Sequence, residues 1–466
     1  HLEPLGFIKF DLLGLSTLEM IESCIRHLLQ REGIAENPTY DDVAEWYKNN
    51  LHPDVLDLED SDVYKHVFHK GNFVGVFQFT NDGAQKFCKS AKPDNIIDIS
   101  AITSIYRPGP LSAKVDQEYA KAKRKPESIH YVNDIVKEVT EETAGFLIFQ
   151  EQIALLASKL GKDISLDEAN LLRKLLTKKG TGKGAREKER IKVKFVQGCV
   201  EKGIDRTTAD AMWKKFEYFS GYGFNKSHAV SYSILSYQCA WLYYYYPECW
   251  AAAFLDKEPE SRKEAAVNLV QQYGFKVQKV DVNKSTQQWE ISDGNTLIQP
   301  LSSIKGLGDK AIEQILNNRP FNTPEELLFN ENVVYSKLNK KALQAMAESG
   351  ALDSLVDERF TGLKHFILSS VDNRPKTRKK LISHIDEFRT AEDYSPEERI
   401  EHISSRTGIY PFDLVITQEI RDAIDHYKVP PLGNWDHDLK SAWFIPREVV
   451  KRKTKTGREY WIVKVI

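Results

Sequence analysis

The chain has 466 residues, of which 41% are hydrophobic and 28% are charged. This length and composition describe a globular protein of about three or four domains. The net charge of −2 excludes a global basic excess, so any surface that binds nucleic acid must be local.

The five cysteines are widely scattered, form no C-x-x-C pair and are odd in number. Neither a zinc site nor a disulfide framework is therefore indicated, and a reducing, cytoplasmic setting is the simplest interpretation. No basic segment followed by an apolar core opens the chain, which argues against a secretory signal. Because the chain starts at His1 and runs at once into a strand-like segment, we expect it to be cut from a longer product.

The first predicted element is a strand over residues 6–15, GFIKFDLLGL, in which Lys9 and Asp11 share the more polar face. Ser16 followed by Glu19 is a capping-box pattern, and it predicts an amphipathic helix that starts there. Asp11 would then be mounted rigidly between a strand and a helix.

Further along, residues 40–68 indicate short helices with loops, and the run FVGVFQF at 73–79 is compatible with a strand. A helix is predicted from Asp98 to Tyr106, where RPGP ends it. Helical periodicity dominates residues 146–255. Residues 229–246 carry no charge, but their serines and tyrosines favour a buried core helix over a membrane span.

A strongly basic run lies between Arg173 and Lys194, with ten cations and two anions. Such a density suits phosphates, and a solvated helix face is the alternative. The run includes Arg173, Lys174, Lys178 and Lys179. Its GTGKG string is not a Walker motif, because Thr177 stands where that motif needs its first glycine.

The string YGFNKSHA, residues 222–229, places several donors just before the long apolar helix. Donors at a helix start suit an anion; Lys226 can neutralise a phosphate, and His228 can donate a hydrogen bond or a proton. Asn225 belongs to the same group. A purely structural loop is the alternative.

A second module begins near Leu301, where IKGLGDKA predicts a helix-hairpin-helix. Gly306 and Gly308, next to Lys305, would let backbone N–H groups approach a phosphate without reading sequence. An ordinary glycine-containing turn is the alternative. Residues 371–401 predict a solvated helical connector, and residues 442–466 predict two strands around a turn at 455–457.

Nine strings, taken in order, resemble the C-family replicative DNA polymerases, the family of the bacterial polymerase III alpha subunit. They are FIKFDLLGL, GVFQF, YRPGPL, IFQEQIALLA, LLRKLLTKK, YGFNKSHAVSY, IKGLG, LNKKALQAMAESGALD and GIYPFDL. Their order and spacing are far more specific than any one string, and the likeness covers residues 6–414.

The resemblance implies a mixed α+β fold that is mostly α-helical. Its expected parts are the C-terminal part of a nucleotidyltransferase-like palm over 1–72, helical fingers over 73–256, a helix-hairpin-helix duplex-binding module over 257–370, a charged helical connector over 371–440, and the first strands of an incomplete OB-fold over 441–466.

The resemblance also implies site residues. Asp11 would be a catalytic metal ligand, and Lys9 would point at the primer-end phosphates. Gln150 and Glu151 would organise a surface for the triphosphate and template, and Lys305, Gly306 and Gly308 would contact the duplex. The residues expected to line the triphosphate and template side are Arg107, Arg173, Lys174, Lys178, Lys179, Asn225, Lys226 and His228.

The implied activity is that of a DNA-directed DNA polymerase, which adds deoxynucleotides to a primer 3′ end by phosphoryl transfer with two Mg²⁺ ions. The family carries its other two catalytic aspartates in a P-D-x-D-x-D-F string, which does not occur here. We therefore expect the chain alone to be inactive, and the missing portion to come from an upstream part of the same polypeptide or from a separate chain.

Other expected partners are primer-template DNA and deoxynucleoside triphosphates, with a sliding clamp and a proofreading exonuclease left open, and no membrane. The segment LLRKLLTKKGTGKGAREKE departs from the family's shorter R-R-A-M-G-K-K form, as would suit a phage or other mobile-element polymerase. The alternatives are a non-catalytic DNA-binding scaffold or inactive polymerase remnant, and a nucleotide-binding enzyme of another kind.

Overall fold

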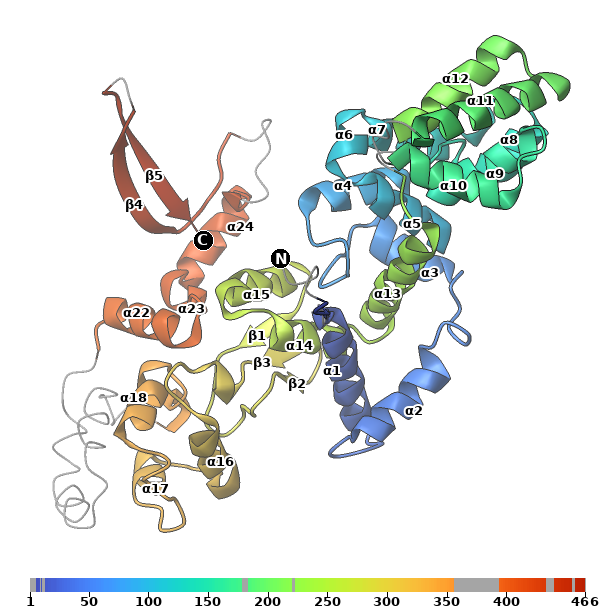
Figure 1. Ribbon diagram of the computed structural model, residues 1–466. Coiled ribbons are helices and arrows are strands. Elements are labelled where there is room, and N and C mark those ends of the chain that lie inside the picture. The colour runs from blue at the N-terminus through green and yellow to red at the C-terminus, as the bar shows by residue number, and fades with distance from the viewer. Residues whose placement is uncertain are drawn as a thin grey trace. The chain divides into compact units, whose positions relative to one another are not determined.

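The computed structural model describes residues 6–8, 10, 13–177, 183–219, 223–355, 394–432, 440–454 and 457–465. These residues form many helices and few strands, which confirms the mixed, mostly α-helical fold class (Figure 1). The chain divides into two compact units, His1–Lys279 with Lys284–Pro300, and Val280–Asn283 with Leu301–Ile466. The finer division into five segments stays a prediction.

The first unit is closed by two helices that are far apart in the sequence. Helix α1 (Ser16–Arg31) buries Ile21, Ile25 and Leu28 and packs against α14 (Pro247–Lys257). The predicted capping box is wrong: Leu15 is the N-cap, with no side-chain cap bond, so Ser16 already lies inside the helix. Helix α2 (Tyr40–Asn50), α3 (Ser61–Val63) and the π-helical turn η2 (Tyr64–His69) follow, as expected for residues 40–68.

Two predicted strands are not observed. Residues 73–79 form turns, because Gly75 and Gln78 adopt positive φ angles of 62° and 69° that a strand cannot contain. The run is apolar because it is a buried loop, in which Phe73, Val76 and Phe79 are at most 2% exposed. The described part of 6–15, which leaves out residues 9, 11 and 12, also contains no strand. Its residues Phe7, Ile8, Phe10 and Leu13 are exposed, and an extended segment needs hydrogen-bonded neighbours to be stable.

The helices expected over 98–106 and 146–255 are confirmed. Helix α5 ends at Ile105, just before the RPGP string. Helices α9 to α12 enclose a core that contains Leu172, Phe195 and Trp213, while α13 packs against α5, where Ser100 donates to Ser233 over 3.0 Å. The helices from α4 to α13 are α4 (Asp82–Ala91), α5 (Ile96–Ile105), α6 (Pro108–Ser112), α7 (Val115–Arg124), α8 (Asp134–Thr140), α9 (Gln150–Leu160), α10 (Leu166–Thr177), α11 (Lys183–Glu201), α12 (Arg206–Phe219) and α13 (Lys226–Tyr245).

Helix α13 contains most of the uncharged stretch for which a membrane span was weighed. It buries Ser233, Ser236 and Gln238 inside the first unit. Among the residues that the structure describes, no helix is long and apolar enough to cross a membrane.

A small sheet follows α14 and α15 (Lys263–Gln272). Its strands are β1 (Lys276–Gln278), β2 (Glu290–Ser292) and β3 (Thr296–Ile298), in the order β1-β3-β2. Strand β3 pairs in parallel with β1 and antiparallel with β2. Asp256, at the end of α14, links this sheet to α1. Its Oδ1 accepts a hydrogen bond at 3.0 Å from the N–H of Trp289, the residue before β2, and its Oδ2 lies 3.2 Å from Nε2 of His27 on α1.

The second unit begins with the predicted hairpin module. The helix expected at Leu301 is only a 3₁₀ turn, and the turn at Gly306 leads into α16, which is fully formed. A common core that includes Leu301, Ile312 and Leu343 holds these elements together. They are η6 (Leu301–Ser303), α16 (Asp309–Asn318), α17 (Pro324–Leu328), α18 (Lys340–Glu348) and η7 (Asp353–Leu355).

Beyond η7, the residues that the structure describes form three helices and one hairpin. Residues 371–393 and 433–439 of the connector expected over 371–440 lie outside the described residues. Its first described helix is α22 (Pro396–Thr407), followed by α23 (Phe412–Val415) and α24 (Gln418–Tyr427). The two strands expected near the end are confirmed as the antiparallel pair β4 (Pro446–Lys453) and β5 (Glu459–Val465).

Candidate nucleic-acid interface

The N-terminus of α13 is set by Asn225. The Oδ1 atom of Asn225 accepts a hydrogen bond from the His228 N–H at 2.9 Å, so Asn225 is the N-cap. The next two donors of this turn face a carboxylate: the Asn225 Nδ2 and the Lys226 N–H each donate to Glu151 over 2.9 Å. The helix start therefore holds an anion, and that anion is a side chain of the protein itself, Glu151. Phosphate binding by these donors stays a prediction.

Glu151 reaches this position because two distant loops pair. The Gln150 N–H donates to the Phe224 carbonyl at 2.9 Å, and the Phe224 N–H donates to the Ile148 carbonyl at 3.0 Å. The Gln150 side chain also donates to the Gly223 carbonyl at 2.8 Å. The start of α9 and the start of α13 are thereby held side by side, and their polar side chains share one surface.

Three cations from separate segments converge on this surface. The guanidinium of Arg107 lies 3.8 Å from the centre of the Phe224 ring, and partial burial lowers the pKa of Arg107. Arg173 on α10 has its Nη1 3.3 Å from Oε1 of Gln150 and 3.8 Å from Oε1 of Glu151. Lys226 bonds both oxygens of Glu142 with its Nζ at 2.7 Å.

The structure thus brings together five of the eight residues predicted for the triphosphate and template side: Arg107, Arg173, Asn225, Lys226 and His228. The His228 ring lies 5.4 Å from the Phe224 ring and 4.2 Å from that of Tyr232. Lys174 is exposed on α10, while Lys178 and Lys179 lie outside the described residues.

Two members of this cluster were missed by the sequence analysis. Glu142 is separated from Lys226 by 84 positions, and no local pattern links them. Phe224 was read only as part of a turn, although its ring is the platform for Arg107 and its backbone joins the two loops.

The predicted metal ligand Asp11 and its neighbour Lys9 lie outside the described residues. Within the described ranges there is no group of three His, Cys, Asp or Glu side chains placed to hold a metal ion.

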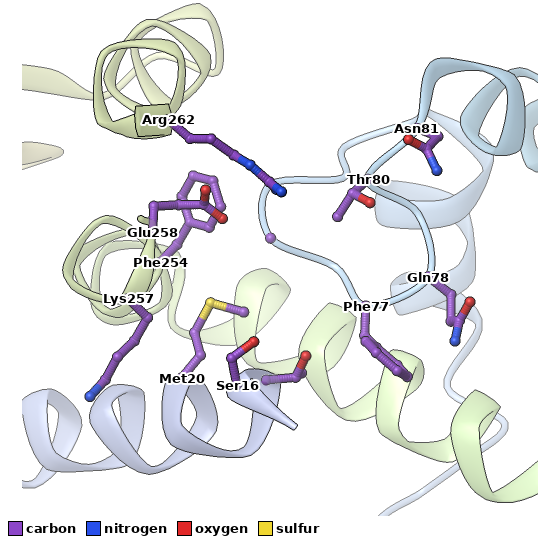
Figure 2. Close-up of a pocket in the computed structure, with 12 residues that line it drawn as sticks. Ser16, Met20, Phe77, Gln78, Thr80, Asn81, Phe254, Lys257, Glu258 and Arg262 are labelled. Carbon is purple, nitrogen blue, oxygen red and sulfur yellow. The ribbon is translucent and has the colours of Figure 1, made fainter. Parts of the chain in front are cut away.

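A pocket of about 330 Å³ lies at the start of α1. Met20, Phe77 and Phe254 supply its apolar lining, and Figure 2 shows Arg262 extending across it toward the loop that carries Thr80. Burial raises the pKa of Glu258 on one wall. The sequence analysis did not predict this pocket, because its wall combines three segments far apart in the chain.

In the second unit, the hairpin turn is built around Gly306. This residue has a φ of +102°, and a Cβ there would lie 3.2 Å from Nη1 of Arg406 and 3.4 Å from the Cβ of Ala345. The positive φ favours a glycine, and an added Cβ would also require the Arg406 side chain to shift by a few tenths of an ångström. Gly308 is the N-cap of α16 and has open space around it, and Lys305 directly precedes the turn.

Two family models match segments that contribute residues to these sites, although the start of α13 lies between the two matched segments. Residues 17–203 match the bacterial DNA polymerase III alpha subunit finger domain, and residues 274–361 match a helix-hairpin-helix motif. The chain therefore belongs to the family of bacterial DNA polymerase III alpha subunits, which confirms the resemblance found in the sequence.

Curated relatives agree with this assignment. The DNA polymerase III subunit alpha of Xylella fastidiosa (strain 9a5c) is 34% identical over 361 residues, which are 77% of this chain and 29% of the relative. The corresponding protein of Borreliella burgdorferi is 33% identical over 390 residues, 82% of this chain and 31% of the relative. That of Treponema pallidum is 30% identical over 434 residues, 88% of this chain and 34% of the relative. The chain spans about a third of the length of these relatives.

Proposed function

We propose that this chain is part of a DNA-directed DNA polymerase that adds deoxynucleotides to a primer 3′ end. Its fingers would bind the triphosphate and the template, and its helix-hairpin-helix would grip the duplex. The observation that carries the proposal is the convergence of Arg107, Arg173 and Lys226 on the start of α13. Arg107 and Arg173 lie inside residues 17–203, which match the finger domain, and Lys226 follows that segment in the chain.

The chemistry of this surface suits phosphate. Arginine presents a planar fork of donors, and lysine supplies a compact charge, so the two together can bind several phosphate oxygens. Asn225 and His228 would add further side-chain donors at the helix start. Lys174, Lys178 and Lys179 would extend the same positive surface along the basic run.

Two acidic side chains already contact these cations and would compete with phosphate for them. Glu142 and Glu151 already occupy the donors of Lys226, and Glu151 lies near Arg173. A phosphate would have to displace them. We therefore propose that nucleic acid or nucleotide binding exchanges these internal pairs for pairs with phosphate oxygens.

Divalent ions in such enzymes neutralise the triphosphate and activate the primer hydroxyl. We propose that the ions are Mg²⁺ and that Asp11 is one of their ligands. Two further carboxylates would come from the portion that carries a P-D-x-D-x-D-F string, either upstream in the same polypeptide or in a separate chain. The cytoplasm is the proposed location, with a sliding clamp and a proofreading exonuclease as further expected partners.

Primer extension tests this proposal. The 466 residues alone should extend no primer, and mixing them with a chain that carries the other two aspartates should restore synthesis. In that complex Asp11→Ala should lower the rate by orders of magnitude while the affinity for primer-template stays unchanged. Robust Mg²⁺-dependent synthesis by the chain alone would contradict the assigned roles, and activity untouched by Asp11→Ala would favour the non-catalytic scaffold.

A further inference from the structure

Helix α22 contacts the hairpin turn directly, although it lies beyond residues 274–361, which match the helix-hairpin-helix motif. The Lys305 N–H donates to the Arg406 carbonyl at 2.8 Å. In return, Nη1 of Arg406 donates to the Lys305 carbonyl at 2.9 Å. Both backbone polar groups of Lys305 are therefore bound by one residue, which follows it by about a hundred positions.

The guanidinium of Arg406 is itself held in place by α18. Its Nε donates to Oε2 of Glu348 at 2.6 Å, and its Nη2 lies 2.5 Å from the same oxygen. The Glu348 side chain is 7% exposed, so this carboxylate is fixed in the core of the module. Glu348 thus orients Arg406, and Arg406 in turn orients the Lys305 carbonyl.

The direction of that carbonyl determines the direction of the next donor. In a planar trans peptide the C=O of Lys305 and the N–H of Gly306 point in opposite directions. Because the carbonyl points at Arg406, the Gly306 N–H is directed away from α22. A glycine favours this orientation of the turn, because Gly306 has a φ of +102° that other residues rarely adopt and lies against the Arg406 side chain.

We propose that Arg406 is a positioning residue for the duplex-binding hairpin, and that α22 is a functional part of that module. Arg406 would fix the Lys305–Gly306 peptide so that its N–H faces a DNA phosphate. The charge of Arg406 is already paired with Glu348. Arg406 would therefore act by orienting the peptide and would contribute little to the long-range attraction of DNA. This inference rests on the proposed duplex-binding function of the hairpin.

The same helix offers a matched control. Arg399 on α22 has its Nη2 2.9 Å from Oδ2 of Asp353, and this pair joins α22 to η7 without touching the hairpin turn. The two ion pairs are similarly buried, with the arginine side chains 30% and 23% exposed. Arg399→Gln therefore removes an anchor of α22 and leaves the Lys305 contacts intact.

The test uses the full 466-residue chain and a fluorescently labelled DNA duplex, with affinity measured by anisotropy at several salt concentrations. Arg406→Gln should weaken binding about tenfold, because a hydrogen bond to a charged phosphate is lost. Arg406→Lys should not restore it, since one ammonium cannot hold Glu348 and the Lys305 carbonyl in the same geometry. Arg399→Gln should change the affinity less than about twofold, although it too should lower the melting temperature, because it removes an ion pair of α22.

The salt dependence of the DNA affinity distinguishes a residue that orients the turn from a residue that attracts DNA by its charge. Arg406→Gln should leave the slope of log affinity against log salt unchanged, whereas Lys305→Gln should reduce it by about one unit. Wild-type affinity in Arg406→Gln, full rescue by lysine, or equal losses in Arg399→Gln and Arg406→Gln would each overturn the positioning role. If Lys305→Gln also binds like wild type, the duplex-binding function of the hairpin is overturned with it.

Discussion

Replacing Glu142 by glutamine tests how the finger surface exchanges its internal partners for phosphate. The Nζ of Lys226 lies 2.7 Å from both oxygens of Glu142, with side chains 32% and 35% exposed. Solvent screens such a pair, and it is worth about 0.2–1 kcal/mol. If Lys226 binds phosphate, this energy opposes binding, because the carboxylate must first release the ammonium.

Glu142→Gln should therefore raise the affinity for a primer-template about 1.5- to 5-fold at low salt, and the gain should shrink as salt is added. The measurement is anisotropy of labelled DNA at two salt concentrations. Glu138→Gln is the matched control, because Glu138 lies four residues before Glu142, on α8, and pairs instead with Lys159. An unchanged affinity in Glu142→Gln, or an equal gain in both variants, would refute the exchange at Lys226.

Three further predictions concern the fold. Gly75→Ala should lower the free energy of unfolding by about 1–3 kcal/mol, because Gly75 has a φ of +62° and the new Cβ would lie 2.7 Å from a Phe254 ring carbon. Gly274→Ala, at a positive φ but in open space, should lower it less. Equal decreases in the free energy of unfolding, measured by denaturant titration, would contradict the packing argument. Hydrogen bonds from Thr207 and Thr208 lower the pKa of Asp205 to about 2 from an ordinary 3.8, so the stability that Asp205 adds is present above pH 3.8 and lost as the pH falls toward 2. The melting temperature of Asp205→Asn should accordingly fall below that of the wild type at pH 6 and approach it near pH 2, and a difference independent of pH would refute the linkage. All five cysteines are buried, and burial raises the thiol pKa of Cys199 and Cys249 to about 11. A thiol reagent at pH 8 should therefore label none of the five cysteines in the native chain and all of them after unfolding.

Local patterns predicted the features that depend on local chemistry. Asn225 was expected among the donors at the start of an apolar helix, and it is the N-cap of α13. The glycines of the hairpin were expected to allow close backbone approach, and Gly306 indeed has a positive φ beside a tightly packed side chain. In both cases the responsible atoms lie within a few residues of one another.

Tertiary packing decided the rest. The run at 73–79 has the composition of a strand, but Gly75 and Gln78 turn the backbone, and the apolar residues are buried by surrounding helices. Likewise, the partners of Lys226 and Lys305 are Glu142 and Arg406, and nothing near either lysine in the sequence identifies them. Charge counting predicted a positive surface, while the folded chain neutralises part of it with its own carboxylates.

The packing of α1 against α14 has a consequence for biosynthesis. More than two hundred residues separate the two helices, and Arg31 on α1 pairs with Glu248 on α14 at 2.8 Å. At roughly 5–20 residues per second, a ribosome needs about 10–40 s to deliver α14 after α1 has emerged. During that interval the apolar face of α1 is open to chaperones, and the first unit cannot complete its folding before α14 has been translated.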